Sequence, residues 1–156
     1  MKHLLIILSL FLFSFTVISC SDEKEDSTEN SGTTTTTTDD TTKFVGVGES
    51  GTIVRSTDNG SSFDNATSPT SNHFSGVTFG NNTFLAVGYQ GNIVRSTDNG
   101  SSFSTVSGGL YNYGVTFGNN IFVVVGSGGT ILRSTDNGSS FSSVTSPTSN
   151  TLKSVT

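Results

Sequence analysis

The chain has 156 residues, a formal net charge of −5 and a single Cys. Its length fits one domain of modest size, the single Cys excludes a disulfide scaffold, and seven Lys and Arg against twelve Asp and Glu argue against a nucleic-acid partner. Residues 20–42 hold seven of the carboxylates against one Lys, whereas residues 43–156 carry five basic and five acidic side chains. We therefore expect an acidic segment followed by a neutral folded part.

Residues 1–19 have the layout of a signal peptide. Their apolar run over residues 4–18 is too short, and too abruptly followed by acidic residues, to predict a membrane span. The end of this run, Val17-Ile18-Ser19-Cys20, resembles the lipobox of bacterial lipoproteins, in which the signal is cleaved before the Cys and the Cys is acylated. The alternative is an ordinary signal peptide with an incidental Cys. The resemblance implies that lipid on Cys20 attaches the protein to a membrane of the bacterial cell envelope, in the outer membrane or at the cell surface.

Residues 20–42 are predicted to be a disordered, acidic and Thr-rich linker behind the lipid anchor. After Cys20 they contain no apolar residue larger than Gly, so they cannot bury enough surface to offset the entropy of ordering. The acidic cluster directly after Cys20 is similar to the surface-export signals of lipoproteins in Bacteroidetes-type bacteria, although plain solvated linkers share this composition.

The folded part is built from one repeated unit. The octet Ser-Thr-Asp-Asn-Gly-Ser-Ser-Phe occurs at residues 56–63, 96–103 and 134–141, with offsets of 40 and 38 residues. The domain over residues 43–156 therefore divides into a partial unit at 43–71, full units at 72–110 and 111–150, and the beginning of another at 151–156.

Each full unit is predicted to hold four short strands. In the second copy these are residues 74–79, a turn at 80–82, residues 84–87, a loop at 89–91, residues 92–96, and a strand near 103–106 that follows the octet. Nothing after Cys20 shows a helical period of apolar residues. We expect an all-β fold of four-stranded antiparallel units, and a period near 40 residues is typical of β-propeller blades, about three of which fit here.

The octet matches the Asp-box (BNR-like) pattern, Ser-x-Asp-x-Gly-x-x-aromatic. This pattern occurs in sialidases, in sortilin-type receptors and in the photosystem II assembly and stability factor family. The longer string Gly-Thr-Ile-Val-Arg-Ser-Thr-Asp-Asn-Gly at residues 51–60 most resembles the last of these. One departure is the Phe at the place where the motif commonly has Trp. The resemblance implies a propeller but says little about function, because unrelated activities share the same blade.

We interpret the octets as structural. The Asp carboxylate accepts bonds from nearby backbone N–H groups, Asn and Gly tolerate positive φ, Ser closes the turn, and Phe packs back into the blade. One carboxylate per octet is too few for calcium, which takes 6–8 oxygen ligands, so we expect neither a metal nor a cofactor. The residues given this structural role are Ser56, Asp58, Gly60, Phe63, Ser96, Asp98, Gly100, Phe103, Ser134, Asp136, Gly138 and Phe141.

An Arg stands three residues before each octet Asp, at Arg55, Arg95 and Arg133. The favoured interpretation is a repeated charge pair between each Arg and its own Asp, worth at most about 1 kcal/mol if exposed. The alternative, which the photosystem-factor resemblance implies, is an arginine surface that receives an anionic partner.

Any binding site is expected at the end of the blades where the repeats differ. The octets and the turns at 80–82 and 118–120 repeat closely, whereas the connections at the other end vary, and recognition benefits from such differences. Tyr offers an apolar face and a polar tip to a peptide or a glycan. The candidate binding residues at this end are Glu49, His73, Tyr89, Gln90, Tyr111 and Tyr113.

Three blades are fewer than the 4–8 of a closed propeller. Residues 151–156 align with the first strand of a unit, while residues 43–71 lack that strand. The chain is expected to be a truncated part of a longer propeller, which the stop inside a strand favours, or to form a homodimer in which two copies join head to tail as a six-bladed ring.

We expect a non-catalytic envelope lipoprotein whose propeller module binds or assembles a protein or a glycan. The alternative is a fragment of a sialidase-like Asp-box glycoside hydrolase that lacks its catalytic blades, and a decayed repeat fragment is a third interpretation. Glu49 and Asp64 fall at opposite blade ends, whereas glycoside hydrolysis needs carboxylates roughly 5–10 Å apart.

Overall fold

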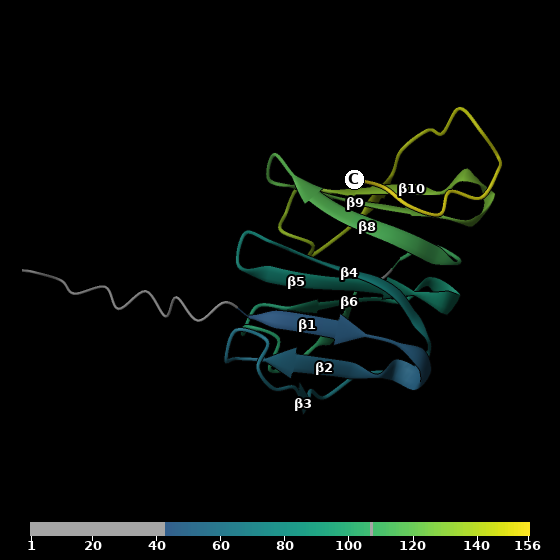
Figure 1. The fold of residues 1–156 in the computed structure, drawn as a ribbon. Coiled ribbons are helices and arrows are strands. Elements are labelled where there is room, and N and C mark those ends of the chain that lie inside the picture. Colours follow the sequence, from purple (N-terminus) through teal and green to yellow (C-terminus); the bar gives the residue numbers. More distant parts are fainter. Residues whose placement is uncertain (1–42, 107) are drawn as a thin grey trace, which may run out of the picture. The chain divides into compact units, whose positions relative to one another are not determined.

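The computed structural model describes residues 43–106 and 108–156, so the predictions for the signal peptide, Cys20 and the linker lie outside the described residues. Three antiparallel sheets make up the described part (Figure 1). Within each sheet, strands that follow one another in the chain are hydrogen-bonded neighbours. The predicted all-β class and the four-stranded antiparallel unit are confirmed.

The first sheet has three strands and the other two have four each. The first contains β1 (Phe44–Val47), β2 (Ile53–Ser56) and β3 (Asp64–Asn65). The second contains β4 (Phe74–Gly80), β5 (Thr83–Gly88), β6 (Ile93–Ser96) and β7 (Ser104–Val106). The third contains β8 (Asn112–Gly118), β9 (Ile121–Gly126), β10 (Ile131–Ser134) and β11 (Ser142–Ser143).

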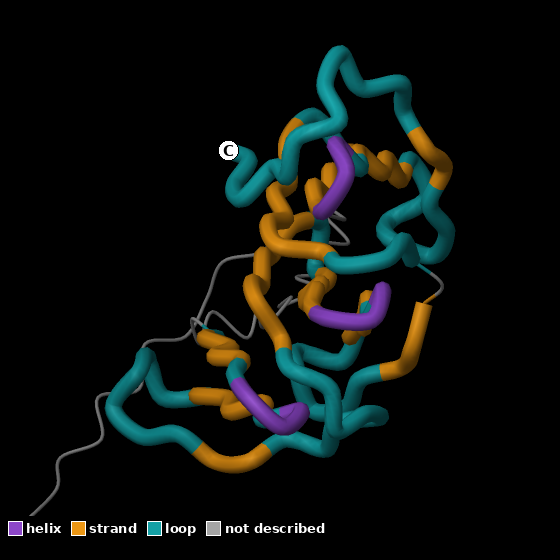
Figure 2. Tube along the Cα trace, turned by 90° about the vertical axis from the view of Figure 1, so that its right-hand side faces the viewer, coloured by secondary structure: helices purple, strands orange, loops and turns teal. Residues whose placement is uncertain are grey.

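In each sheet a single 3-10 turn joins two strands where the sequence predicts a loop: β1 to β2, β5 to β6, and β9 to β10. These turns are η1 (Glu49–Gly51), η2 (Tyr89–Gly91) and η3 (Ser127–Gly129). Figure 2 faces the end of the sheets at which they lie and shows them in purple. No helix in the described part of the chain is long and apolar enough to cross a membrane.

The opposite end carries the tight hairpin turns that the sequence predicts. Asn81 and Asn82 join β4 to β5 with φ angles of 46° and 56°, and Asn119 and Asn120 join β8 to β9 with 49° and 61°. Two successive positive φ angles are what a type I′ hairpin requires, and Asn adopts them more readily than most residues. Hairpin geometry thus sets the register of these strand pairs.

The sheets bury their apolar residues against one another. Successive side chains of a strand point to opposite faces, so β5 gives Phe84 and Ala86 to one apolar cluster and Leu85 and Val87 to another. The first cluster also contains Ile53 of β2, and the second contains Phe122 of β9. The second sheet is therefore covered on both faces, and β5 is buried along its whole length.

Residues 151–156 form no strand but run beside β8. Leu152 N–H donates to the Gly126 carbonyl at 3.0 Å, as Phe74 N–H donates to the Gly48 carbonyl at 3.0 Å. A Cβ placed on Gly114 would lie 3.0 Å from the Cα of Ser154. This final segment therefore lies against β8, as β8 lies against β4.

Candidate functional site

An aromatic hollow of about 490 Å³ opens at the end of the sheets that carries the 3-10 turns. Four of the residues predicted from the sequence meet there, whereas Gln90 and Tyr111 are not part of its lining. Its lining comes from η1, β4, η2, β8 and the final segment. The residues that line it are Glu49, His73, Phe74, Ser75, Tyr89, Tyr113 and Lys153.

We call this pocket the aromatic hollow. Tyr89 is the centre of the cluster of rings at this pocket. Its ring centroid lies 5.6 Å from that of Tyr111 and 6.2 Å from that of Tyr113, both edge-on, and 5.8 Å from that of His73. Edge-to-face pairs of this kind are worth about 0.5–1.5 kcal/mol beyond the area they bury. Tyr89 is nevertheless 43% exposed, so its ring is held in place and still open to a ligand.

Lys153 is a lining residue that the sequence reasoning missed. Its Nζ lies 4.0 Å from the centre of the Tyr113 ring, a cation–π contact. The signal in the sequence was its alignment with Tyr113 and Ser75 in the earlier units, which places it at the same blade end. Together with Glu49 it gives the aromatic hollow one cation and one anion, so both charged and apolar groups of a ligand could be recognised.

Main-chain bonds hold the tips that carry these side chains. Tyr89 N–H donates to the His73 carbonyl at 2.9 Å, and Ser127 N–H donates to the Tyr111 carbonyl at 2.9 Å. Because these bonds use only backbone atoms, the side chains at the tips are free to differ between repeats. This explains how variable residues sit on a regular framework.

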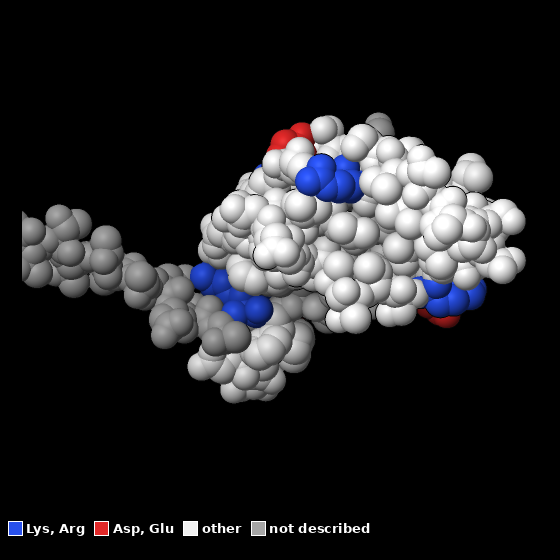
Figure 3. Space-filling model, turned by 90° about the horizontal axis from the view of Figure 1, so that it is seen from above, with Lys and Arg blue, Asp and Glu red and all other residues white. Residues whose placement is uncertain are grey.

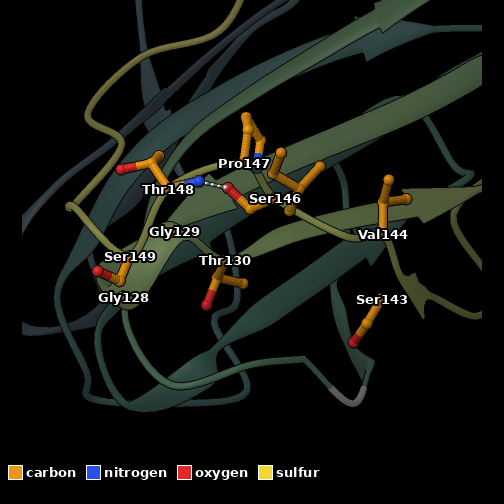
Figure 4. Close-up of a pocket in the computed structure, with 10 residues that line it drawn as sticks. Gly128, Gly129, Thr130, Ser143, Val144, Ser146, Pro147, Thr148 and Ser149 are labelled. Carbon is orange, nitrogen blue, oxygen red and sulfur yellow. Dashed lines mark hydrogen bonds between the residues drawn. The ribbon is translucent and has the colours of Figure 1, made fainter.

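A second hollow, of about 500 Å³, lies on the third sheet. Its lining comes entirely from residues 128–149 and includes Ile131 and Val144, and Thr148 N–H donates to Ser146 Oγ at 3.4 Å within it (Figure 4). No titratable or aromatic side chain of the described residues lines it. We call it the third-sheet hollow, and because its described lining lacks aromatic and charged side chains it is a poorer candidate for specific recognition than the aromatic hollow.

The three octets, at the other end of the sheets, bond to themselves in the same way. In the first, Ser56 Oγ donates to Asp58 Oδ1 at 2.7 Å, and Gly60 N–H donates to Ser56 Oγ at 2.9 Å. Ser62 adds a bond from its N–H to Asp58 Oδ1 at 3.0 Å and one from its Oγ to Oδ2 at 2.6 Å. Gly60 has a φ of +82°, which a residue with a side chain rarely adopts.

The same bonds recur with matching lengths in the octets of Asp98 and Asp136. Each carboxylate is thus occupied by donors of its own turn. In the described part of the chain, no three His, Cys, Asp or Glu side chains gather as metal ligands.

These bonds lower the pKa of every octet Asp. The Ser62 hydroxyl, its N–H and the Ser56 hydroxyl lower the pKa of Asp58 from 3.8 to about 2. Burial raises the pKa of Asp98, but the hydroxyls of Ser102 and Ser96 outweigh it and bring the pKa to about 2. The Ser140 hydroxyl leads the bonds that lower the pKa of Asp136 further still.

The free energy of unfolding is expected to fall as the pH drops from about 4 to about 2. A folded-state pKa below the unfolded one adds stability above the unfolded pKa, and this stability is lost as the pH falls through the folded pKa. Urea unfolding followed by circular dichroism at each pH measures the slope. The triple variant Ser62→Ala, Ser102→Ala, Ser140→Ala should give a shallower slope, and an equal slope would show that the octet carboxylates do not cause the effect.

The expected charge pairs between each Arg and its own octet Asp are wrong. Arg55 Nη1 donates to Ser101 Oγ, and Arg95 Nε donates to the Asn137 carbonyl at 2.8 Å. Each of these arginines therefore reaches the octet of the next repeat. The physical reason is that the serines of each octet already occupy its Asp, while the Arg lies on the sheet face that the next sheet covers.

Arg133 is the exception among the three. It is exposed, and within residues 43–106 and 108–156 its guanidinium meets no acceptor. Arg55 and Arg95 are half-buried between successive sheets. The alternative of an arginine surface for an anionic partner stays a prediction.

Asn137 is a further residue that the sequence reasoning did not single out. Besides accepting from Arg95, it donates through Nδ2 to Thr83 Oγ1 at 2.7 Å and accepts from Asn81 Nδ2 at 3.2 Å. The third octet is thereby bonded to the β4–β5 hairpin of the second sheet. The octets therefore join sheets as well as closing their own turns.

Comparison with known proteins identifies the architecture. No protein-family model matches the chain, and no curated protein matches it. Among solved structures it is similar to YCF48 bound to D1 peptide, with 21% identity and a TM-score of 0.61 over 72% of this chain and 40% of that one. It is also similar to an ancestral GH74 enzyme, with 19% identity and a TM-score of 0.53 over 71% of this chain and 18% of that one.

These likenesses show the fold alone: the three sheets are β-propeller blades, as predicted. The chain spans less than half the length of YCF48 and less than a fifth of the GH74 enzyme.

Proposed function

We propose that the chain is a non-catalytic propeller module that binds a segment of another protein in the aromatic hollow. One observation carries the proposal: side chains that differ between repeats converge at this end, from two 3-10 turns, two strands and the final segment. The other end holds three identical octets. A protein of the same fold, YCF48, was solved with a peptide bound, and this supports the capacity of such blades for peptide recognition.

The chemistry of the aromatic hollow suits a peptide. Its volume of about 490 Å³ falls in the range of about 300–1,000 Å³ common for ligand pockets. Tyr side chains supply rigid contact area with few rotatable bonds, which is why they are favoured in binding surfaces. Lys153 and Glu49 would pair with charged groups of opposite sign on the bound segment. A glycan is the second candidate ligand, because the exposed face of Tyr89 could stack on a sugar ring.

We further propose that lipid on Cys20 holds the module at the bacterial cell envelope, in the outer membrane or at the cell surface. The sequence around Cys20 resembles a lipobox, and the linker that follows is polar and acidic. Acyl chains anchor by burying CH₂ groups at about 0.8 kcal/mol each, so more than one chain gives a stable attachment. A homodimer belongs to the same proposal, since the two outer blade faces carry apolar side chains of the kind that the inner faces bury.

The alternative of a glycoside hydrolase fragment draws on the shared fold of the GH74 enzyme. In the described residues, Glu49 lies in η1, at one end of the first sheet. Asp64 lies opposite Arg55 in the register of β2 and β3, towards the octet end. Hydrolysis by these two carboxylates is therefore disfavoured, and this alternative requires catalytic residues from other blades.

The test uses the full chain with two probes, a phage-displayed library of random peptides and a glycan array. We expect the chain to enrich related peptides, and their affinity should fall at least tenfold when Tyr89 is replaced by Ala. Phe79→Ala is the matched control, because Phe79 is an exposed aromatic at the hairpin end of β4 and should leave the affinity unchanged.

Enriched peptides that bind the Tyr89→Ala variant as tightly as the unaltered chain would place the site elsewhere. Binding to the glycan array alone would favour the second candidate. Hydrolysis of a sialoside or another glycoside would favour the enzyme fragment.

A further inference from the structure

Two blade faces of the described residues have no sheet packed over them. One is the outer face of the first sheet, where Phe63 is 50% exposed although its counterpart in the second octet, Phe103, is only 8% exposed. Phe44 of β1 is also exposed, whereas its counterparts Phe84 and Phe122 are buried. Identical or closely related residues thus differ in burial only because no blade precedes them in the described part.

The other uncovered face belongs to the third sheet, and it carries the matching surface. Within the chain, the octet Phe of one blade belongs to an apolar cluster that includes two residues of the blade before it. Phe103 shares a cluster with Ile53 and Ala66, and Phe141 shares one with Ile93 and Val106.

The equivalent residues of the third blade are Ile131 and Val144. Both line the third-sheet hollow of about 500 Å³, among Ser and Thr side chains, and Figure 4 labels Val144 at its edge. The octet Phe of a following blade would occupy this position.

The polar contacts between blades also run from each blade to the one that follows it in the chain. Arg55 and Arg95 each donate to the octet of the following blade. Gly100 packs so closely on the preceding blade that a Cβ there would lie 2.8 Å from Val45 Cγ2, and Gly100 is buried while Gly60 is exposed.

The third blade has the donor of such a contact, Arg133, but no following octet among the described residues. Figure 3 views the molecule from above, and most of the described surface on that side belongs to uncharged residues.

We propose that the first blade of a second copy of this chain covers the third blade, in the same way as successive blades pack within the chain. Phe63 of one copy enters the third-sheet hollow of the other beside Ile131 and Val144, and Arg133 donates to the Ser61 hydroxyl. The contact joins two different surfaces, so it is heterologous.

The described blades of two copies joined at both ends number six, which lies within the 4–8 of closed propellers. This inference rests on the homodimer of the proposed function and specifies its surfaces.

The experiment measures the molar mass of the full chain, solubilised in a mild detergent, by light scattering over a dilution series. We expect two copies for the unaltered chain. Phe63→Ser and Arg133→Glu, made separately, should each raise the dissociation constant at least tenfold. Neither residue packs inside a blade contact of the described chain, so circular dichroism should show both variants folded. Phe79→Ser is the matched control, because Phe79 is 51% exposed but belongs to β4 of the second blade, so its replacement should leave the mass unchanged.

Mixing the two variants separates a heterologous contact from a symmetric one. The Phe63→Ser copy keeps an intact third blade and the Arg133→Glu copy keeps an intact first blade, so the mixture should regain one contact and form a one-to-one pair. A symmetric interface would give no such recovery. A two-copy mass that neither variant lowers would retain the homodimer but overturn these surfaces, and a single-copy mass for the unaltered chain would overturn both.

The peptide-binding site is tested independently, since Tyr89→Ala should leave the mass unchanged.

Discussion

Replacing Gly91 with Ala is expected to lower the free energy of unfolding by about 3–5 kcal/mol, the sum of backbone strain and overpacking. Gly91 ends η2 with a φ of +73°, which a residue with a side chain adopts only at a cost. A Cβ there would also lie 1.8 Å from the carbonyl oxygen of Gly109. Neither backbone segment can yield without moving the connection between β7 and β8. Urea unfolding followed by circular dichroism gives the free-energy difference.

Gly128→Ala is the matched control for this change. Gly128 lies in the equivalent turn of the third blade with a φ of +64°, but no atom lies within 4 Å of a Cβ placed on it. Only the conformational cost remains, about 1 kcal/mol. Equal losses in the two variants would show that the close approach to Gly109 contributes nothing to stability.

Replacing Phe122 with Ala is expected to cost about 3–5 kcal/mol of the free energy of unfolding. Phe122 is 0% exposed and packs in the cluster between the second and third sheets, with its ring 4.7 Å from that of Phe117. The removed ring would leave a cavity that two covered sheets cannot easily close. The same urea titration measures the loss.

Phe79→Ala provides the comparison for Phe122. Phe79 is 51% exposed, and its ring lies 4.5 Å from that of Phe84. Its removal should cost about 1 kcal/mol or less, as is usual for exposed positions. A loss at Phe122 no larger than that at Phe79 would contradict the assignment of Phe122 to the core.

The strands were predictable because the signals for them are local. Short apolar runs between turn residues, repeated at offsets of 40 and 38, indicate antiparallel hairpins without knowledge of distant contacts. The Asn81-Asn82 turn was predictable for the same reason. The 3-10 turns were missed, because three residues are too few to show a helical period and because Ser50 and Gln90 take positive φ angles that non-glycine residues rarely adopt.

The partners of the arginines could not be deduced in the same way. Arg55 stands three residues from Asp58 in the chain, and proximity in sequence suggested a pair that the structure does not contain. The acceptor of Arg55 lies 46 residues away, on the next blade. The burial of each octet Phe could not be predicted from the sequence either. Phe63 and Phe103 follow identical residues and differ only in what packs against them. For the candidate site, variation between repeats led to four residues that meet in the aromatic hollow, but not to Lys153, and binding at this end stays a prediction.

The main-chain bonds at the blade tips allow the binding specificity to change over time without a change of fold. Tyr89 and Ser127 occupy equivalent positions and make the same backbone bond, although their side chains have nothing in common. Substitutions at these positions would therefore alter what the module binds while leaving its scaffold intact. A protein of this design could acquire new ligands by point mutation, and an engineer could graft a chosen set of tip residues onto the same three blades.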